Sequence, residues 1–210
     1  MIDRADHLEK MYGATGWVST LRNALPQTAR NVSLVVSEAR FKVGQVDEYS
    51  GNAFALYGAA AIQNLEEDGL TGMSLSVTDL NWDIDYDDLD ELDTAGIVAL
   101  INRRGRVRVW KDRTLATTST DPGKYLTNMR IVQTLVNDIT KALQKFIGGP
   151  FPSSAEVESL VREAIEKREG FLASSYDITF YRRRGFFTVD LSVEFFGFIH
   201  TITAKVEIKI

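Results

Sequence analysis

The chain has 210 residues, a formal net charge of −5, no cysteine, and 44% hydrophobic and 25% charged residues. This composition is that of an ordinary globular protein, and one domain is the expectation at this length. The lack of cysteine excludes disulfides and thiolate chemistry, and the acidic balance argues against nucleic-acid binding. The charged N-terminus lacks the apolar run of a signal peptide. No stretch approaches the ~20 apolar residues that span a bilayer.

The first third of the chain interleaves helices and strands. Residues 3–12 predict a short helix, and residues 17–25 predict a second one that stops at Pro26. Residues 31–37 predict a strand, because their apolar centre is rich in β-branched side chains. Residues 50–64 predict a helix with a small-residue face. Tight packing on a sheet explains that face better than a phosphate site, since no phosphate-binding glycine pattern accompanies it.

The middle of the chain predicts a β-hairpin. A short alternating strand at 80–85 and an acidic turn or helix at 86–94 lead into buried strands at 97–101 and 107–110. The turn between them is Arg103-Arg104-Gly105, where glycine can take the positive φ that short hairpin loops need. A loop opened by Trp110 and by Arg113-Thr114-Leu115 follows.

The second half predicts two long helices followed by strands. Apolar residues recur at three and four positions from Pro122 to about Phe146, before Gly148-Gly149-Pro150 ends the helix. Ser153 or Ser154 caps the next helix. Three strands follow from Tyr176. This order predicts an α/β (α+β) fold, with a mixed sheet packed by the two long helices. The expected core includes Trp110, Leu135, Ile139 and Phe146.

An acidic run is the candidate metal site, and it consists of Asp83, Asp85, Asp87, Asp88, Asp90, Glu91 and Asp93. The first three match the opening of a calcium-binding EF-hand loop. The sixth position is Asp88 instead of glycine, and the twelfth is Thr94 instead of glutamate. A solvated or partner-facing surface is therefore the favoured interpretation. A small ligand- or calcium-binding α/β module that uses residues 83–93 is the alternative.

The sequence offers little for catalysis. His7 and His200 are far apart in the sequence, and there is no nucleophile elbow, phosphate loop or dinucleotide motif. No catalytic residue, metal ligand or cofactor site is predicted, and the chain is not expected to be an enzyme.

Two basic turns could meet acidic surface on another copy. They are Arg103-Arg104-Gly105-Arg106 and Arg182-Arg183-Arg184-Gly185. Their candidate acidic partners are Asp87, Asp88, Asp90 and Glu91. Many weak charge pairs along a polymer would set its register and still allow rearrangement. The alternative is that the turns are solvated hairpin tips.

The last ten residues alternate strictly between apolar and polar side chains. One side carries Ile202, Ala204, Val206, Ile208 and Ile210. Such a strand needs a sheet edge, either in its own domain or in a neighbour. The alternation alone favours its own domain.

Several segments, taken in order, resemble the C-terminal core of contractile tail sheath proteins, the family of myophage tails and related injection machines. The resemblance covers roughly residues 31–210. It rests on the acidic lead-in 88–96, Gly96-Ile97, Trp110, Arg113-Thr114-Leu115, residues 125–130, and residues 146–151 with the helix and strands after them. The chain departs from the family at Ile131, where a second arginine often follows Arg130. It also begins without the usual N-terminal arm and outer domains, as expected of a fragment or a minimal member.

The resemblance implies a structural subunit that stacks around an inner tube. Its partners would be other copies, a tail tube protein and baseplate or tail-terminator proteins, in a virion tail assembled in the host cytoplasm. Direct nucleic-acid or membrane binding is not expected. The predicted organisation is a lead segment 1–30, a core 31–198 and a C-terminal β-arm 199–210, with Gly197 as the hinge. The alternation of apolar and polar side chains alone favours pairing within its own domain, but the resemblance implies that this arm links to a neighbouring copy.

Overall fold

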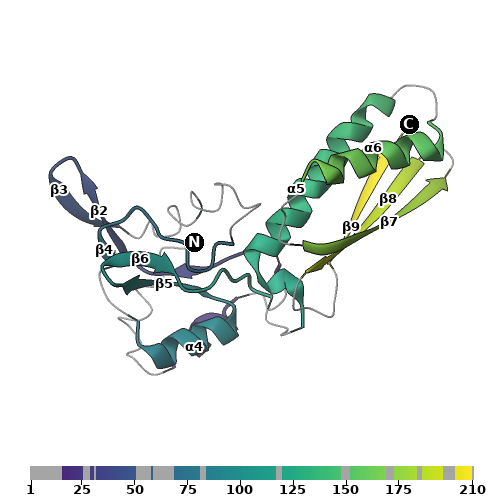
Figure 1. Ribbon diagram of the computed structural model, residues 1–210. Coiled ribbons are helices and arrows are strands. Elements are labelled where there is room, and N and C mark those ends of the chain that lie inside the picture. The colour runs from purple at the N-terminus through teal and green to yellow at the C-terminus, as the bar shows by residue number, and fades with distance from the viewer. Residues whose placement is uncertain are drawn as a thin grey trace. The chain divides into compact units, whose positions relative to one another are not determined.

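The computed structural model describes residues 16–25, 29–30, 32–50, 58, 69–80, 84–116, 120–147, 152–168, 173–183, 186–195 and 202–209 (Figure 1). The chain forms two compact units, Met1–Thr127 and Asn128–Ile210. The single core predicted for 31–198 is therefore divided, and 199–210 belongs to the second unit. The predicted helices at 3–12 and 50–64 lie outside the described residues, apart from Gly58. No helix in the described ranges is long and apolar enough to cross a membrane.

The first unit is built on a mixed sheet of order β1-β5-β6. Strand β1 (Val35–Val36) runs parallel to β5 (Val98–Arg103), and β5 is antiparallel to β6 (Arg106–Val109). Arg104 and Gly105 both have positive φ, 55° and 73°. A two-residue turn of this kind matches the twist of its strands. The predicted hairpin is confirmed, whereas the strand predicted at 31–37 is shorter than expected.

Two helices cover one face of this sheet. They are α2 (Trp17–Asn23) and α4 (Tyr86–Ala95), and α4 lies beside β5 in Figure 1. Buried side chains on both sides of the contact include Trp17, Leu92 and Ile97. Gly96 ends α4 in the left-handed conformation with φ 74°, and the Ile97 amide donates to the Leu92 carbonyl over 2.9 Å.

The opposite face packs on a second core that includes Leu70, Leu80, Leu100 and Val107. Leu80 belongs to an antiparallel sheet of order β3-β2-β4, formed by β2 (Ala39–Val43), β3 (Val46–Ser50) and β4 (Asp79–Leu80). The strand predicted at 80–85 is confirmed only at its first residue. Ile84 and Asp85 are not in a strand, and 81–83 lie outside the described residues. The β2–β3 hairpin was not predicted.

The second unit packs two helices on one face of a three-stranded sheet (Figure 1). A short 3-10 turn at Pro122–Lys124 precedes α5 (Leu126–Leu143), and α6 (Ser154–Glu166) follows. Ser153 caps α6, as predicted, with its hydroxyl accepting from the Glu156 amide over 3.2 Å. The buried centre includes Leu135, Ile139 and Leu191, and Phe146 lies at its border with 9% of its surface exposed.

This sheet has the order β7-β8-β9 and is antiparallel throughout. Its strands are β7 (Ala173–Arg183), β8 (Phe186–Phe195) and β9 (Ile202–Lys209). Consecutive strands with short connections must run antiparallel, because a parallel pair needs a long crossover. The α/β (α+β) class is confirmed. The prediction that the two long helices pack on a mixed sheet is wrong, since the mixed sheet belongs to the first unit.

Strand β9 pairs with β8 of its own chain, from Val193 opposite Ile202 to Phe186 opposite Lys209. Ile202 and Val206 are buried in the core of this unit, and Ala204 packs against it. The physical reason lies in the backbone of β8, which pairs with β7 on one side. Without β9, the backbone donors and acceptors on its other side would be unpaired. The expectation that 199–210 leaves its domain as an arm is therefore corrected for this chain. Gly197 and Ile210 lie outside the described residues.

Candidate functional site

Three of the segments that carry the family resemblance meet at the C-terminal end of α4, in what we call the Asp93 cluster (Asp93, Lys111, Arg113 and Tyr125). Asp93 Oδ2 accepts from Arg113 Nη2 over 2.7 Å and from Lys111 Nζ over 2.9 Å. Arg113 Nε donates to Asp93 Oδ1, and the Arg113 guanidinium lies 4.6 Å from the centre of the Tyr125 ring. Three elements that are distant in sequence are thereby joined.

Burial raises the pKa of Asp93, but hydrogen bonds from Arg113 and Lys111 outweigh it and hold the pKa below its ordinary value. Burial lowers the pKa of Arg113, and the bonds to Asp93 reverse this, so that its pKa is raised. A carboxylate in the last turn of a helix faces the negative end of the helix dipole. The two cations offset that repulsion, and the cluster is therefore suited to a structural role, in which it holds α4 against the segment 111–113.

A second buried carboxylate, Asp112, holds the beginning of α5. Its Oδ2 accepts from the Thr127 amide over 2.9 Å and from the Thr127 hydroxyl, and its Oδ1 accepts from the Thr71 hydroxyl. The Asp112 side chain thus serves as the N-terminal cap of α5, although this helix begins only at Leu126. Sequence reasoning missed this residue, because its partners lie 41 and 15 positions away.

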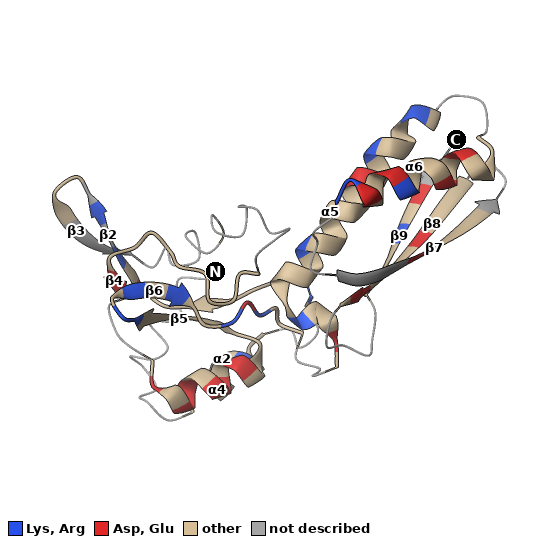
Figure 2. Cartoon of the chain, viewed as in Figure 1, with Lys and Arg blue, Asp and Glu red and all other residues tan. Residues whose placement is uncertain are grey.

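The predicted basic turn at the β5–β6 hairpin is exposed. Arg103, Arg104 and Arg106 all reach solvent, and no ion pair within the described ranges involves them. The acidic residues proposed as their partners lie on α4, where Asp87, Asp90 and Glu91 are exposed and Asp88 is half-buried. Figure 2 shows the basic hairpin and the acidic helix in the same unit.

A pocket of about 360 Å³ lies between these two charged regions. One wall comes from the N-terminal end of α4 and the other from the β5–β6 hairpin. The lining residues are Ile84, Asp85, Tyr86, Leu89, Ile101, Asn102, Arg103 and Trp110. Trp110, predicted to be core, is only partly buried. Asp85 of the acidic run and Arg103 of the basic turn thus line one pocket, whereas the predicted partner residues Asp87, Asp88, Asp90 and Glu91 do not line it.

The second basic turn lies at the end of β7. Arg182 and Arg183 occupy its last two positions, opposite Phe187 and Phe186. The side chains of these arginines and all of Arg184 lie outside the described residues, as does the side chain of Ile208. The inter-copy role of this turn stays a prediction.

The acidic run does not have the geometry of a calcium loop. Residues 86–95 form a helix, which spreads successive side chains around its axis instead of converging them. Asp93 is already bound by two cations. Among the described residues, no three histidine, cysteine or acidic side chains are grouped to hold a metal ion.

No protein-family model and no curated protein matches this sequence. Solved structures do match its fold. The chain resembles the sheath tail protein of Desulfitobacterium hafniense, with a TM-score of 0.69 and 15% identity over 98% of this chain and 54% of that one. It also resembles a sheath tail protein of Listeria innocua, with a TM-score of 0.70 and 12% identity over 94% of this chain and 54% of that one.

A third match is a chain in the baseplate of the anti-feeding prophage, with a TM-score of 0.59 and 16% identity over 87% of this chain and 52% of that one. The chain therefore has the fold of the sheath tail proteins, as the resemblance predicted. It spans about half the length of the structures it matches.

Proposed function

We propose that this chain is a structural subunit of a contractile tail sheath. Copies stack around an inner tube in a virion tail that is assembled in the host cytoplasm. The tail tube protein and baseplate or tail-terminator proteins are its other partners, and it has no catalytic role. The observation that carries the proposal is the match of almost the whole chain to sheath tail proteins at TM-scores of 0.69 and 0.70.

Two kinds of surface would join the copies. The exposed arginines of the β5–β6 hairpin would meet the acidic face of α4 on a neighbour, as a set of weak charge pairs. The β7-β8-β9 sheet has β7 and β9 as its outer strands. Their outer edges could each accept a strand from another copy.

Contraction in this proposal is a rigid-body rearrangement of compact units. The division of the chain into two compact units between Thr127 and Asn128, each with buried core residues of its own, supports this proposal. The energy would reside in the metastable contacts of the extended assembly, with no nucleotide consumed.

Electron microscopy of the purified full chain tests this function. Rings, tubes or sheath-like polymers are expected, formed by the chain alone or on addition of a tail tube protein. A protein that remains strictly monomeric under all these conditions, and binds calcium, would contradict the proposal and favour the ligand-binding alternative.

A further inference from the structure

A groove of about 470 Å³ lies between α5 and α6 in the second unit. Ala142, Leu160 and Ala164 supply its apolar lining, and they also border the core of this unit. Alanine at two of these three positions leaves room between the helices. The groove therefore offers apolar surface that a side chain from outside could cover.

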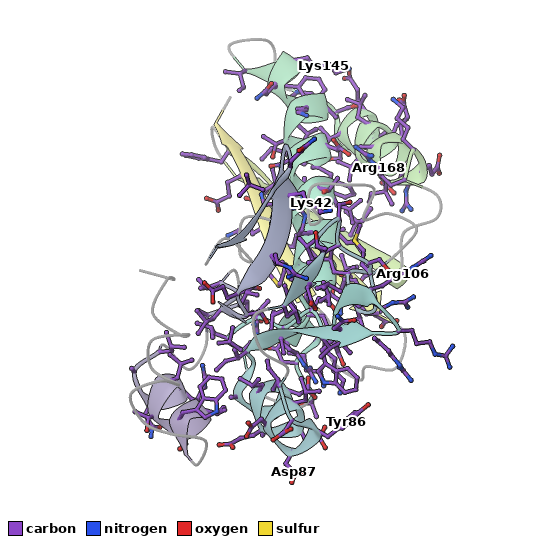
Figure 3. The ribbon with its side chains drawn as sticks, turned by 90° about the vertical axis from the view of Figure 1, so that its left-hand side faces the viewer. Lys42, Tyr86, Asp87, Arg106, Lys145 and Arg168 are labelled. Carbon is purple, nitrogen blue, oxygen red and sulfur yellow. The ribbon has the colours of Figure 1, made fainter. Side chains whose placement is uncertain are left out.

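The border of this groove is basic on the α5 side. The carboxylates of the lining are already paired within the unit, Asp138 with Arg168 and Glu163 with Lys167, each over 2.7 Å. Lys141 also lines the groove, and Lys145 is exposed one turn further along the chain. Neither lysine forms an ion pair with another residue in the described ranges. Figure 3 shows Lys145 after the end of α5 and Arg168 after the end of α6. This border is therefore suited to carboxylates from a partner.

The sheet face opposite α5 and α6 carries the complementary charge. Ile178 and Phe180 of β7 pack against the core under the helices. The residues that alternate with them, Asp177, Thr179 and Tyr181, are exposed and therefore lie on the other face. The charged side chains described on this face are Asp177, Asp190, Glu194, Lys205 and Glu207. Lys205 pairs with Glu207 over 2.9 Å, so carboxylates predominate on the rest of the face.

Two aromatic side chains on the same face reach solvent. Tyr181 is 50% exposed and Phe186 is 43% exposed. Tyr181 lies opposite Thr188, two residues from Phe186, so the two rings are diagonal neighbours on adjacent strands. Exposed aromatic rings beside carboxylates complement a groove in which apolar surface lies beside lysines.

We propose that the α5–α6 groove of one copy binds the acidic, aromatic sheet face of the next copy. Lys141 and Lys145 meet the carboxylates of that face, and its aromatic rings cover the apolar lining of the groove. The two surfaces lie on opposite sides of one helix–sheet layer, so the contact is heterologous and repeats from copy to copy, as a ring or helical polymer requires. This inference rests on the proposed function, which supplies the other copies, and it identifies the surfaces through which the second units stack.

Cysteine cross-linking tests the inference, because the full chain has no cysteine of its own. Lys141→Cys and Thr179→Cys are prepared as separate variants, mixed in equal amounts, assembled and treated with a short bis-maleimide. Dimers that join 141 to 179 should exceed those that join 141 to 141 or 179 to 179, since a heterologous contact brings unlike faces together. In the control, Val46→Cys replaces Thr179→Cys, because Val46 is 59% exposed in the first unit. If the protein assembles but the 141–179 product is no more abundant than the 141–46 product, this inference is wrong and the proposed function stands.

Charge reversal provides a second measurement. Lys141→Glu places like charges at the contact and should raise the concentration needed for assembly about ten-fold, the change that ~1.4 kcal/mol of contact energy gives. Arg162→Glu makes the same change of charge at an exposed position of α6 that does not line the groove, and it should leave that concentration unchanged. Equal effects of the two reversals would count against the groove as the contact. If the unmodified chain never assembles, both this inference and the proposed function are wrong.

Discussion

The carboxylate of Asp93 lies between Lys111 and Arg113, and its pKa is held below the ordinary value. A depressed pKa stabilises the fold above the unfolded-state value, near 3.9, and this stability is lost as the pH falls through the folded-state pKa. Asp93→Asn should therefore lower the free energy of unfolding at pH 7 and flatten its decline below about pH 4.

Breaking a buried ion pair costs about 3–5 kcal/mol. The Asp93 side chain is 15% exposed, which places the expected loss at the lower end. Urea unfolding across the acid range measures both effects. Glu91→Gln, an exposed change on the same helix, is the control. An unchanged pH dependence for Asp93→Asn would rule out this account of the cluster.

Asp112 and Asp85 allow a matched comparison of two carboxylates that precede helices. Asp112 accepts from the Thr127 amide and from two hydroxyls, whereas Asp85 makes no capping bond to α4. Asp112→Ala leaves buried donors unpaired and should cost about 3 kcal/mol. Asp85→Ala should change stability by less than about 0.5 kcal/mol. Equal effects in chemical denaturation would show that the cap contributes nothing specific.

At the scale of elements, β9 completes the sheet of the second unit. Deleting residues 200–210 removes Ile202 and Val206 from the core and exposes one edge of β8. This deletion should therefore unfold the second unit, while the mixed sheet of the first unit keeps its own core. Amide exchange resolved along the chain measures this outcome. A folded second unit that only fails to assemble would restore the arm predicted from the family resemblance.

The elements that sequence predicted correctly have strong local signals. The apolar period of α5, the Ser153 cap of α6 and the glycine turn at Gly105 each act within a few residues. The β2–β3 hairpin also had a signal, since Gly44 stands in a two-residue turn between the β-branched residues Val43 and Val46. That signal was missed.

What the sequence could not reveal depends on contacts between distant residues. The Asp93–Arg113 pair spans 20 positions, and the Thr71–Asp112 bond spans 41. The periodicity of apolar residues in helices and strands carries no information on pairs that are so far apart in the sequence. The boundary between the two units escaped prediction because it falls at Thr127 and Asn128, within the first turn of α5, where the helical pattern is uninterrupted. The charged candidates were predicted, but the pocket that lies between them was not.

At the scale of the whole molecule, charge reversal tests how copies recognise one another. Reversing Arg103, Arg104 and Arg106 to glutamate should leave the monomer folded and weaken assembly. The loss should be largest at low salt, where charges are least screened. Sedimentation over a range of ionic strengths measures it.

The acidic helix supplies the complementary variant, with Asp87, Asp90 and Glu91 changed to lysine. Each variant alone places like charges at the contact, whereas an equal mixture restores opposite charges. Assembly should therefore return on mixing. Two variants that assemble normally when alone would show that the hairpin arginines are only solvated.

Arg104 occupies the first position of the hairpin turn with φ 55°, a region where a side chain with a Cβ is strained. Asparagine tolerates that conformation better. Arg104→Asn should raise the thermal unfolding temperature, by an amount that corresponds to at most ~1 kcal/mol, and should remove one positive charge from the tip. The wild-type chain thus holds a cation at a position where an uncharged residue would make the subunit more stable. A variant that is more heat-resistant but assembles less readily would show that stability of the single subunit is traded against assembly of the polymer.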